Sequence, residues 1–147
     1  MQVGDTVPDF PATLDTGEQT SLTGLLADGP AVFFFYPKAF TPGCTAEACH
    51  FRDLAAEFDA VGASRYGVSR DDVATQHDFS TKHDFDYPLI ADANGSIAKV
   101  FGAKRMGPLW SKRQTFVVGA DRSLLAVISS ETDMERHADE ALQALGA

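Results

Sequence analysis

The feature that most constrains the fold is an uninterrupted apolar run at residues 31–36, with the sequence AVFFFY. The run shows no alternation of apolar and polar residues, which is typical of a strand covered on both of its faces. Pro37 follows it and has no N–H group with which to continue a strand ladder. The run therefore predicts a central strand, with layers of side chains packed on both sides of its sheet.

Strand and helix signals alternate along the rest of the chain, which predicts an α/β fold. Residues 10–14 and 18–22 flank a Gly-containing turn and predict a small N-terminal β-hairpin. Further strands are predicted at 66–69, 89–91, 114–118 and 123–128. Helices are predicted at 42–61, 71–85 and 133–145, with a short one ending at 101. Because no linker, repeat or low-complexity tract divides the chain, we expect residues 1–147 to form one domain with a mixed sheet.

Acidic residues outnumber basic ones, 21 Asp and Glu against 12 Lys and Arg, which gives a net charge of −9. No basic run occurs, so we expect no nucleic-acid partner and no anionic-membrane partner. The first residues lack the charged and apolar regions of a secretory signal, and the longest strongly apolar run is too short to cross a bilayer. We therefore expect a cytoplasmic protein. A chain of this length folds without a disulfide or metal, so its two cysteines are free for chemistry.

Cys44 is predicted to lie in the first turn of the helix at 42–61. Thr41 before it is able to cap the helix, and Pro42 stands at the first helical position. Unpaired N–H groups and the positive end of the helix dipole favour a thiolate there. Because the thiolate is the form that attacks electrophiles, Cys44 is a candidate nucleophile. The alternative, an inert buried thiol, fits poorly with the small, turn-forming residues around it.

Cys49 lies five residues further along the same predicted helix. In an unbroken helix this spacing places the two Cα atoms about 8.6 Å apart and on largely opposite sides. A disulfide needs Cα atoms within about 7 Å. A bond between Cys44 and Cys49 therefore requires the first turns of the helix to unwind. The alternative is that Cys49 acts as a small apolar residue on the buried face near Phe51.

The segment at residues 35–53 closely resembles the active-site segment of peroxiredoxins. It contains Pro-x-x-x-Thr-x-x-Cys, which runs from Pro37 through Thr41 to Cys44. The second Cys five residues later resembles the peroxiredoxin Q type, also called the bacterioferritin comigratory protein type. The resemblance continues in the sequences VPDF, YGVSRD, YPLIAD and RQTFVV further along the chain. Two departures are Arg65, where the family usually has an apolar strand residue, and residues 119–123, which lack the usual Asp-Gly turn.

The resemblance implies a thiol peroxidase on a thioredoxin-like fold, with Cys44 as the peroxidatic and Cys49 as the resolving cysteine. Cys44 would become a sulfenic acid that condenses with Cys49 to a disulfide. A thioredoxin or glutaredoxin-like dithiol is the reductant that the resemblance implies. It implies no metal, haem or flavin cofactor, and a monomer or weak dimer. The substrate is expected to be hydrogen peroxide or an organic hydroperoxide.

The resemblance also implies roles for three residues around Cys44. Thr41 would bond the thiolate or the peroxide, and Arg113 would supply a fixed positive charge with a fork of donors. Pro37 would shield the sulfur from water without adding a competing donor. In the alternative reading Thr41 is a helix cap, Pro37 ends a strand, and Arg113 is a surface cation like its neighbours Lys112 and Arg105.

Other polar and aromatic residues near these motifs are assigned no chemistry. Glu47, His50 and Arg52 are expected to be solvated or paired locally. Leu109 and Trp110 are expected to form either an apolar lip beside the site or a part of the core.

Two other classes of function compete with a peroxidase. A thioredoxin-like disulfide reductase normally carries Cys-x-x-Cys, whereas four residues separate the cysteines in this chain. A metal-binding module would use Cys44, Cys49, His77 and His83, whose spacings within each pair are tolerated in zinc sites. Assays of peroxide consumption, insulin disulfide reduction and bound metal distinguish the three.

Overall fold

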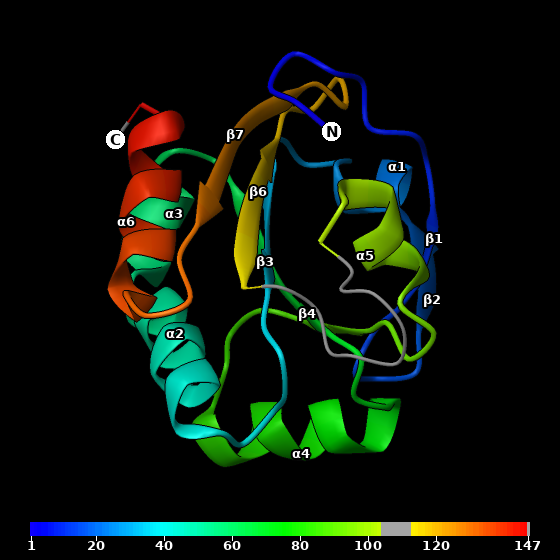
Figure 1. Cartoon of the computed structure of the whole chain (residues 1–147), viewed down its shortest axis with the longest axis vertical. Helices are drawn as coiled ribbons and strands as arrows, with labels where there is room; N and C mark the ends of the chain where they lie inside the picture. The colour runs from blue at the N-terminus through cyan, green and yellow to red at the C-terminus, as the bar shows by residue number, and fades with distance from the viewer. Residues whose placement is uncertain (104–112, 147) are drawn as a thin grey trace.

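The strand predicted at 31–36 is β3 (Ala31–Phe35), the central strand of a five-stranded mixed sheet (Figure 1). The computed structural model describes residues 1–103 and 113–146. The strand order is β5-β4-β3-β6-β7, with β3, β4 and β5 parallel and with β6 and β7 antiparallel to their neighbours. The bounds are β4 (Ser64–Ser69), β5 (Leu89–Ala91), β6 (Gln114–Val118) and β7 (Leu124–Ser129). The predicted mixed α/β sheet is confirmed.

Helices cover both faces of this sheet (Figure 1). Helices α2, α3, α4 and α6 contribute to the core on one face, and α1 and α5 to the core on the other, together with the small hairpin β1-β2. The helix bounds are α1 (Leu22–Leu25), α2 (Pro42–Asp53), α3 (Ala55–Ala60), α4 (Val73–His83), α5 (Ser96–Phe101) and α6 (Met134–Ala144). The sheet therefore lies between two separate hydrophobic cores.

The side chains of β3 alternate between the two cores, which explains why every residue of the run is apolar. Phe33 and Phe35 belong to the core beneath α1 and α5, whereas Phe34 and the following Tyr36 belong to the core beneath α2 and α6. Phe34 stacks on Phe51 of α2, with ring centroids 4.1 Å apart. This stacking fixes α2 against the sheet, and α2 carries both cysteines.

The helix predicted at 42–61 is two helices, α2 and α3, which meet at Leu54. Arg65 of β4 lies beside this junction and donates from Nη1 to the carbonyl oxygen of Phe51 at 2.7 Å. Its guanidinium also forms a two-pronged ion pair with Asp86 and lies 5.0 Å from the ring centroid of Tyr87. Arg65 is 6% exposed. The sequence pattern missed the break because it depends on this contact from a distant strand.

The N-terminal hairpin is shorter than predicted, with β1 (Pro11–Thr13) paired antiparallel to β2 (Gln19–Ser21). The strand predicted to reach residue 22 ends at Ser21, because Ser21 caps α1 instead: its Oγ accepts from the N–H of Gly24 at 3.2 Å. This short helix was not predicted. The helix predicted at 71–85 is likewise trimmed to α4, whose N-cap Asp72 accepts from the N–H of Thr75.

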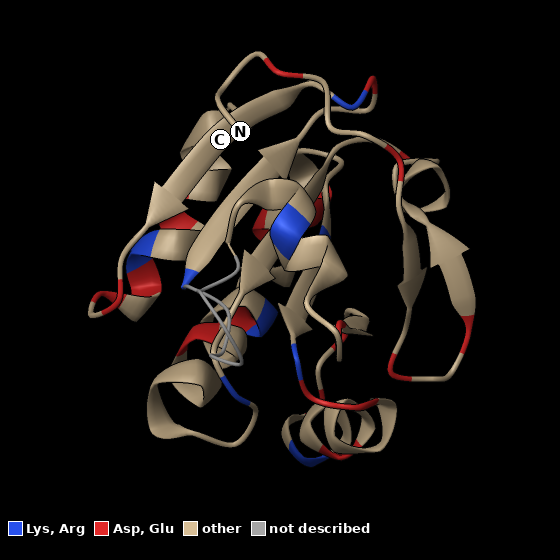
Figure 2. Ribbon diagram, turned by 45° about the vertical axis from the view of Figure 1, so that its right-hand side comes forward, with Lys and Arg blue, Asp and Glu red and all other residues tan. Residues whose placement is uncertain are grey.

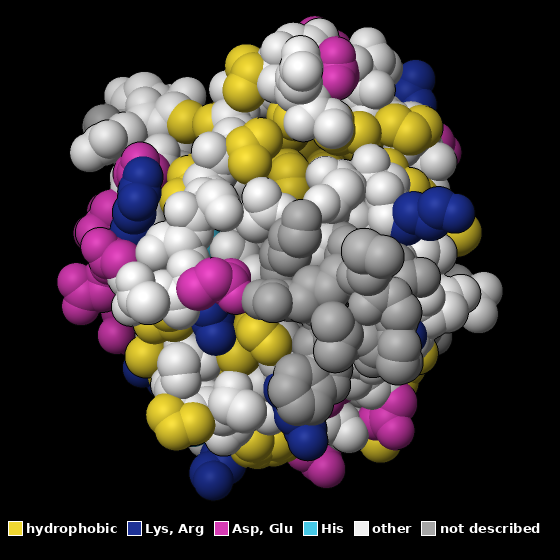
Figure 3. Space-filling model, in the orientation of Figure 1, with side chains coloured by type: hydrophobic (Ala, Val, Ile, Leu, Met, Phe, Trp, Pro, Cys, Tyr) yellow, Lys and Arg dark blue, Asp and Glu magenta, His cyan; other side chains and the backbone are white. Residues whose placement is uncertain are grey.

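Charge is spread over the surface, with basic residues lying between acidic ones (Figure 2). Acidic side chains gather along one edge of the face in Figure 3, at the place where Figure 1 shows α6. The outer side of α6 carries Glu135, Asp139 and Glu140, while its inner side buries Ala138 and Ala141. Within residues 1–103 and 113–146, no helix has the length and apolar character needed to cross a membrane.

The stacking of Phe51 on Phe34 makes a prediction about stability. Phe51 is fully buried, so Phe51→Ala removes a ring from a closed core and should lower the free energy of unfolding by about 3–5 kcal/mol. Phe40→Ala is the matched control, because Phe40 is 43% exposed. This substitution should lower the free energy of unfolding by roughly half as much or less. Urea denaturation of the reduced proteins measures both, and equal losses would contradict the packing described for α2.

Candidate active site

Cys44 is the third residue of α2 and is fully buried. Thr41 is the N-cap residue with an extended backbone, φ −75° and ψ 152°, and Pro42 occupies the first helical position, as predicted. The carbonyl oxygen of Thr41 accepts the first helical bond from the N–H of Thr45 at 2.9 Å. Cys44 therefore sits in the first turn of the helix, where backbone N–H groups have no partner within the helix.

The predicted cap by the Thr41 side chain is wrong. Its hydroxyl makes no bond to an N–H group of α2 and donates instead to the carbonyl oxygen of Lys38 at 2.8 Å. The hydroxyl thus closes the turn that precedes the helix. The Thr41 hydrogen is thus committed to the backbone, while its oxygen lone pairs stay available as acceptors.

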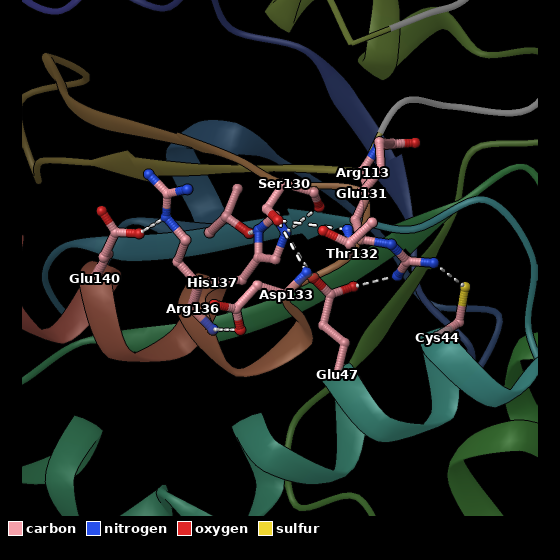
Figure 4. A network of polar contacts seen from close by, with 11 residues as sticks. Cys44, Glu47, Arg113, Ser130, Glu131, Thr132, Asp133, Arg136, His137 and Glu140 are labelled. Atoms are coloured by element: carbon pink, nitrogen blue, oxygen red, sulfur yellow. Dashed lines mark hydrogen bonds and ion pairs between the residues drawn. The ribbon is translucent and has the colours of Figure 1, made fainter.

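Arg113, just before β6, reaches across to Cys44. Its Nη2 donates to Cys44 Sγ at 3.3 Å, and its Nη1 donates to Glu47 Oε1 at 3.0 Å (Figure 4). The side chain is not the surface cation of the alternative reading, because Arg113 is only 7% exposed. Burial works against its charge, but Glu47 and Cys44 outweigh burial and raise the pKa of Arg113. The guanidinium is therefore a fixed positive charge shared by two acidic groups.

Gly43 makes the close approach of Arg113 possible. A Cβ atom at this position would lie 3.3 Å from Arg113 Nη2 and 3.5 Å from Met134 Sδ of α6. The Arg113 side chain thus passes directly over the backbone before Cys44, between α2 and α6.

Glu47 is part of the site, and the prediction that it is solvated or paired at the surface is wrong. It is fully buried. Burial raises its pKa and Arg113 lowers it, and because the effect of burial is larger the pKa of Glu47 is about 8. A pattern in the sequence could have found it: Glu47 lies three residues after Cys44, so both side chains share one face of α2 with Ala48 and Phe51. A carboxyl group on such a face needs a buried partner, and Arg113 is that partner.

Cys49 lies on α2 as predicted and is half-buried, and both cysteines are free thiols. Burial raises the pKa of Cys49. The helix is continuous over both residues, so it holds the Cα atoms farther apart than a disulfide permits. Arg52 is paired locally as expected, with Asp53, whereas His50 pairs with Asp139 of α6, a distant part of the chain.

The segment between β3 and α2 is held by a residue that the sequence pattern did not single out. Asp71 Oδ2 accepts from the N–H of Ala39 at 2.8 Å and from Ser69 Oγ at 2.6 Å. The next residue, Phe40, has φ +67°, which a non-Gly residue rarely adopts. Pro37 is half-buried in this segment, two residues after the end of β3. The contacts of Asp71 thus fix the path that leads the chain from the sheet into α2.

The metal-binding alternative finds no support in the described parts of the chain, where no group of three or more His, Cys, Asp or Glu side chains could hold an ion. His83 instead packs its ring against Phe79 and Phe85. Leu109 and Trp110 lie outside the described residues.

Comparison with known proteins agrees with the geometry. The profile of the AhpC/TSA family matches residues 3–127. The crystal structure of peroxidoxin BcpB from Mycobacterium tuberculosis is similar with a TM-score of 0.95 and 54% identity, over 99% of this chain and 96% of that one. Peroxiredoxin Bcp of Xanthomonas campestris is 36% identical over 95% of this chain and 89% of its own length. A structure of the bacterioferritin comigratory protein of that organism, solved to study its alkyl peroxide reduction activity, has a TM-score of 0.83 at 35% identity, over 92% and 89% of the two chains.

A thiol at the start of a helix, a buried arginine beside it and a thioredoxin-like sheet define the class of thiol peroxidases. The chain belongs to the AhpC/TSA family, as a peroxiredoxin of the Bcp or Q type.

The burial of Glu47 makes a prediction about pH and stability. Its pKa is raised in the folded chain, so between about pH 5 and pH 8 the folded state binds more protons than the unfolded state. The contribution of Glu47 to the free energy of unfolding should therefore fall as pH rises through this window. Glu47→Gln has no such loss. The difference in the free energy of unfolding between wild type and this variant should therefore change steadily with pH. Urea denaturation across the window measures it.

Glu57→Gln on α3 is the control for this prediction, because Glu57 is exposed. The difference in the free energy of unfolding between Glu57→Gln and the wild type should stay constant with pH. A constant difference for Glu47→Gln as well would show that Glu47 is ionised throughout the window.

Proposed function

We propose that this peroxiredoxin reduces hydrogen peroxide and organic hydroperoxides through Cys44 as the peroxidatic thiolate. The observation that carries the proposal is the position of Arg113 Nη2, 3.3 Å from Cys44 Sγ at the first turn of α2. Helix N–H groups and the guanidinium together stabilise the anionic sulfur in a site with little water. The alkyl peroxide reduction activity of the similar Xanthomonas campestris protein supports the choice of organic hydroperoxides.

In the first step, the Cys44 sulfur attacks one peroxide oxygen. The S–O bond forms as the O–O bond breaks, and the other oxygen leaves with the bonding electron pair and takes up a proton, giving water or an alcohol. Cys44 becomes a sulfenic acid. Arg113 donates to the oxygens as charge develops on them. The Thr41 hydroxyl donates to Lys38, so it accepts the hydrogen of the hydroperoxide and orients it.

Pro37 completes the proposed site. It lies between β3 and α2 and has no N–H group, and we assign it the role of shielding the sulfur from water without adding a competing donor.

In the second step, Cys49 resolves the oxidised site. Its sulfur attacks the sulfenic sulfur of Cys44, a disulfide forms, and the hydroxyl group leaves as water. The continuous helix α2 keeps the two sulfurs apart, so its first turns must unwind before this step. A thioredoxin-type dithiol then reduces the disulfide and restores both thiols.

The two-cysteine scheme is tested by mass spectrometry after one equivalent of peroxide. Wild type should form an intramolecular Cys44–Cys49 disulfide and lose both free thiols. Cys49→Ser should still complete the first turnover and accumulate a sulfenic acid that dimedone traps at Cys44. Cys44→Ser should lose peroxidase activity. Normal turnover of Cys49→Ser with thioredoxin would show that another group resolves the sulfenic acid.

The role of Arg113 is tested by Arg113→Lys, which keeps a positive charge but loses the planar fork. The second-order rate of Cys44 oxidation should fall by about 10²-fold, as expected when one preorganised donor is lost. Stopped-flow fluorescence or competition with a second peroxidase measures the rate. Arg136→Lys is the matched control, because Arg136 is an exposed residue of α6 paired with Glu140. If Arg113→Lys and the control oxidise Cys44 at the same rate, Arg113 has no role in the reaction.

A further inference from the structure

A buried histidine lies on the far side of Glu47 from the sulfur. His137 of α6 is fully buried, and its two ring nitrogens each contact a protein oxygen: Nδ1 lies 2.8 Å from Thr115 Oγ1, and Nε2 lies 2.8 Å from the carbonyl oxygen of Ser130 (Figure 4). A carbonyl oxygen only accepts, so Nε2 carries a hydrogen, and Nδ1 of the neutral ring accepts from the Thr115 hydroxyl. Burial lowers the pKa of His137, which keeps the ring neutral. These contacts fix both the tautomer and the direction of the Nε2–H group.

The second oxygen of Glu47 points toward this histidine. Oε1 accepts from Arg113, but Oε2 is buried and has no hydrogen-bond partner among the described residues. His137 Nε2 lies 3.5 Å from Oε2. A buried carboxyl oxygen without a partner is costly, and more so when the group is ionised. The Nε2–H group of His137 donates to Ser130, but at 3.5 Å from Oε2 its dipole acts on the charge of Glu47 through space.

Arg113 is the point at which this contact reaches the sulfur. Its guanidinium lies between Glu47 and Cys44, donating from one nitrogen to each. When Glu47 is protonated, the positive charge of Arg113 acts on the Cys44 thiolate alone. When Glu47 is ionised, two anions share that charge, and the thiolate receives less of it.

We infer that His137 is a positioning residue of the peroxidatic site, which acts through Glu47 to determine how the charge of Arg113 is divided between Glu47 and Cys44. Thr115 of β6 supports this role, because it lies two residues after Arg113 and contacts the His137 ring. The inference rests on the proposed function of Cys44. It adds a connection from α6 to the site.

The electrostatic surroundings of Glu47 agree with this inference. Burial raises its pKa to about 8, so the protonated form predominates at neutral pH and the ionised form appears above it. The titratable and charged groups that face Glu47 or its partners from the elements around it are Arg113, Glu131, Arg136, His137, Tyr87 and Cys44. Among these described groups, Arg113 donates to one Glu47 oxygen, whereas His137 donates its Nε2 hydrogen to Ser130 and lies 3.5 Å from the other Glu47 oxygen without a hydrogen bond to it.

The inference is tested by the pH dependence of Cys44 oxidation by hydrogen peroxide. In wild type the rate should decline as pH rises through about 8, because Glu47 ionises. His137→Leu removes the N–H group that favours the ionised carboxyl, so the decline should move upward by about one pH unit. His137→Gln keeps an N–H donor near the position of Nε2 and should restore the wild-type profile. A purely structural role would lower the rate equally at every pH and leave the decline in place.

His50→Gln is the matched control, because His50 also links α2 to α6, through Asp139 at 2.8 Å. Its profile should match the wild type. If His137→Leu does not fold, Thr115→Val, which removes the donor to Nδ1, should shift the decline in the same direction. The inference would be overturned if the rate of Cys44 oxidation in the folded variant, His137→Leu or Thr115→Val, declined at the same pH as in the wild type.

Infrared spectroscopy separates this inference from the peroxidase proposal. A protonated carboxyl band of the reduced wild type should lose intensity as pH rises through about 8, should be absent in Glu47→Gln, and should persist to higher pH in His137→Leu. The band does not depend on activity. If it behaves as expected while Cys44 does not react with peroxide, the proposed function fails and the contact between His137 and Glu47 stands. If Cys44 reacts but the band is absent at neutral pH, the inference fails alone.

Discussion

The candidate site depends on the buried guanidinium of Arg113, which holds together two acidic groups of α2. Arg113 approaches Cys44 at 3.3 Å and Glu47 at 3.0 Å, and all three side chains are buried. A buried positive charge is stable only when anions satisfy it, and a buried thiolate is stable only beside such a charge. The local requirements of the chemistry and of the fold are therefore met by the same contacts.

The fold meets these requirements by bringing three distant parts of the chain to one end of the sheet. β3 leads directly into α2, so the cysteine begins its helix beside the central strand. β6 pairs with β3 antiparallel, which brings Arg113 to the same end. Helix α6 packs on α2 and places His137 behind Glu47. The proposed peroxidatic site therefore shares α2, through Glu47, with the turns that the proposed disulfide step must unwind.

Much of the site could be predicted from local sequence. The order Thr41, Pro42, Gly43, Cys44 places a thiol at a helix start, and the apolar run of β3 predicts the strand that precedes it. The predictions failed where a side chain contacts a distant backbone or charge. The Thr41 hydroxyl bonds the preceding turn, and Arg65 marks the junction of α2 and α3. Neither contact leaves a periodic signal in the residues next to it.

The sequence by itself determined the alternation of strands and helices and the position of Cys44 at the start of a helix, because hydrophobic periodicity and helix-start signals act over a few neighbouring residues. Only the tertiary structure decided that Glu47 is buried and that Arg113 is its partner rather than a surface cation, with His137 facing the remaining carboxyl oxygen. The state of a charged residue depends on how much water surrounds it and on which charges lie within a few ångströms. Both are set by segments that meet only after the chain has folded.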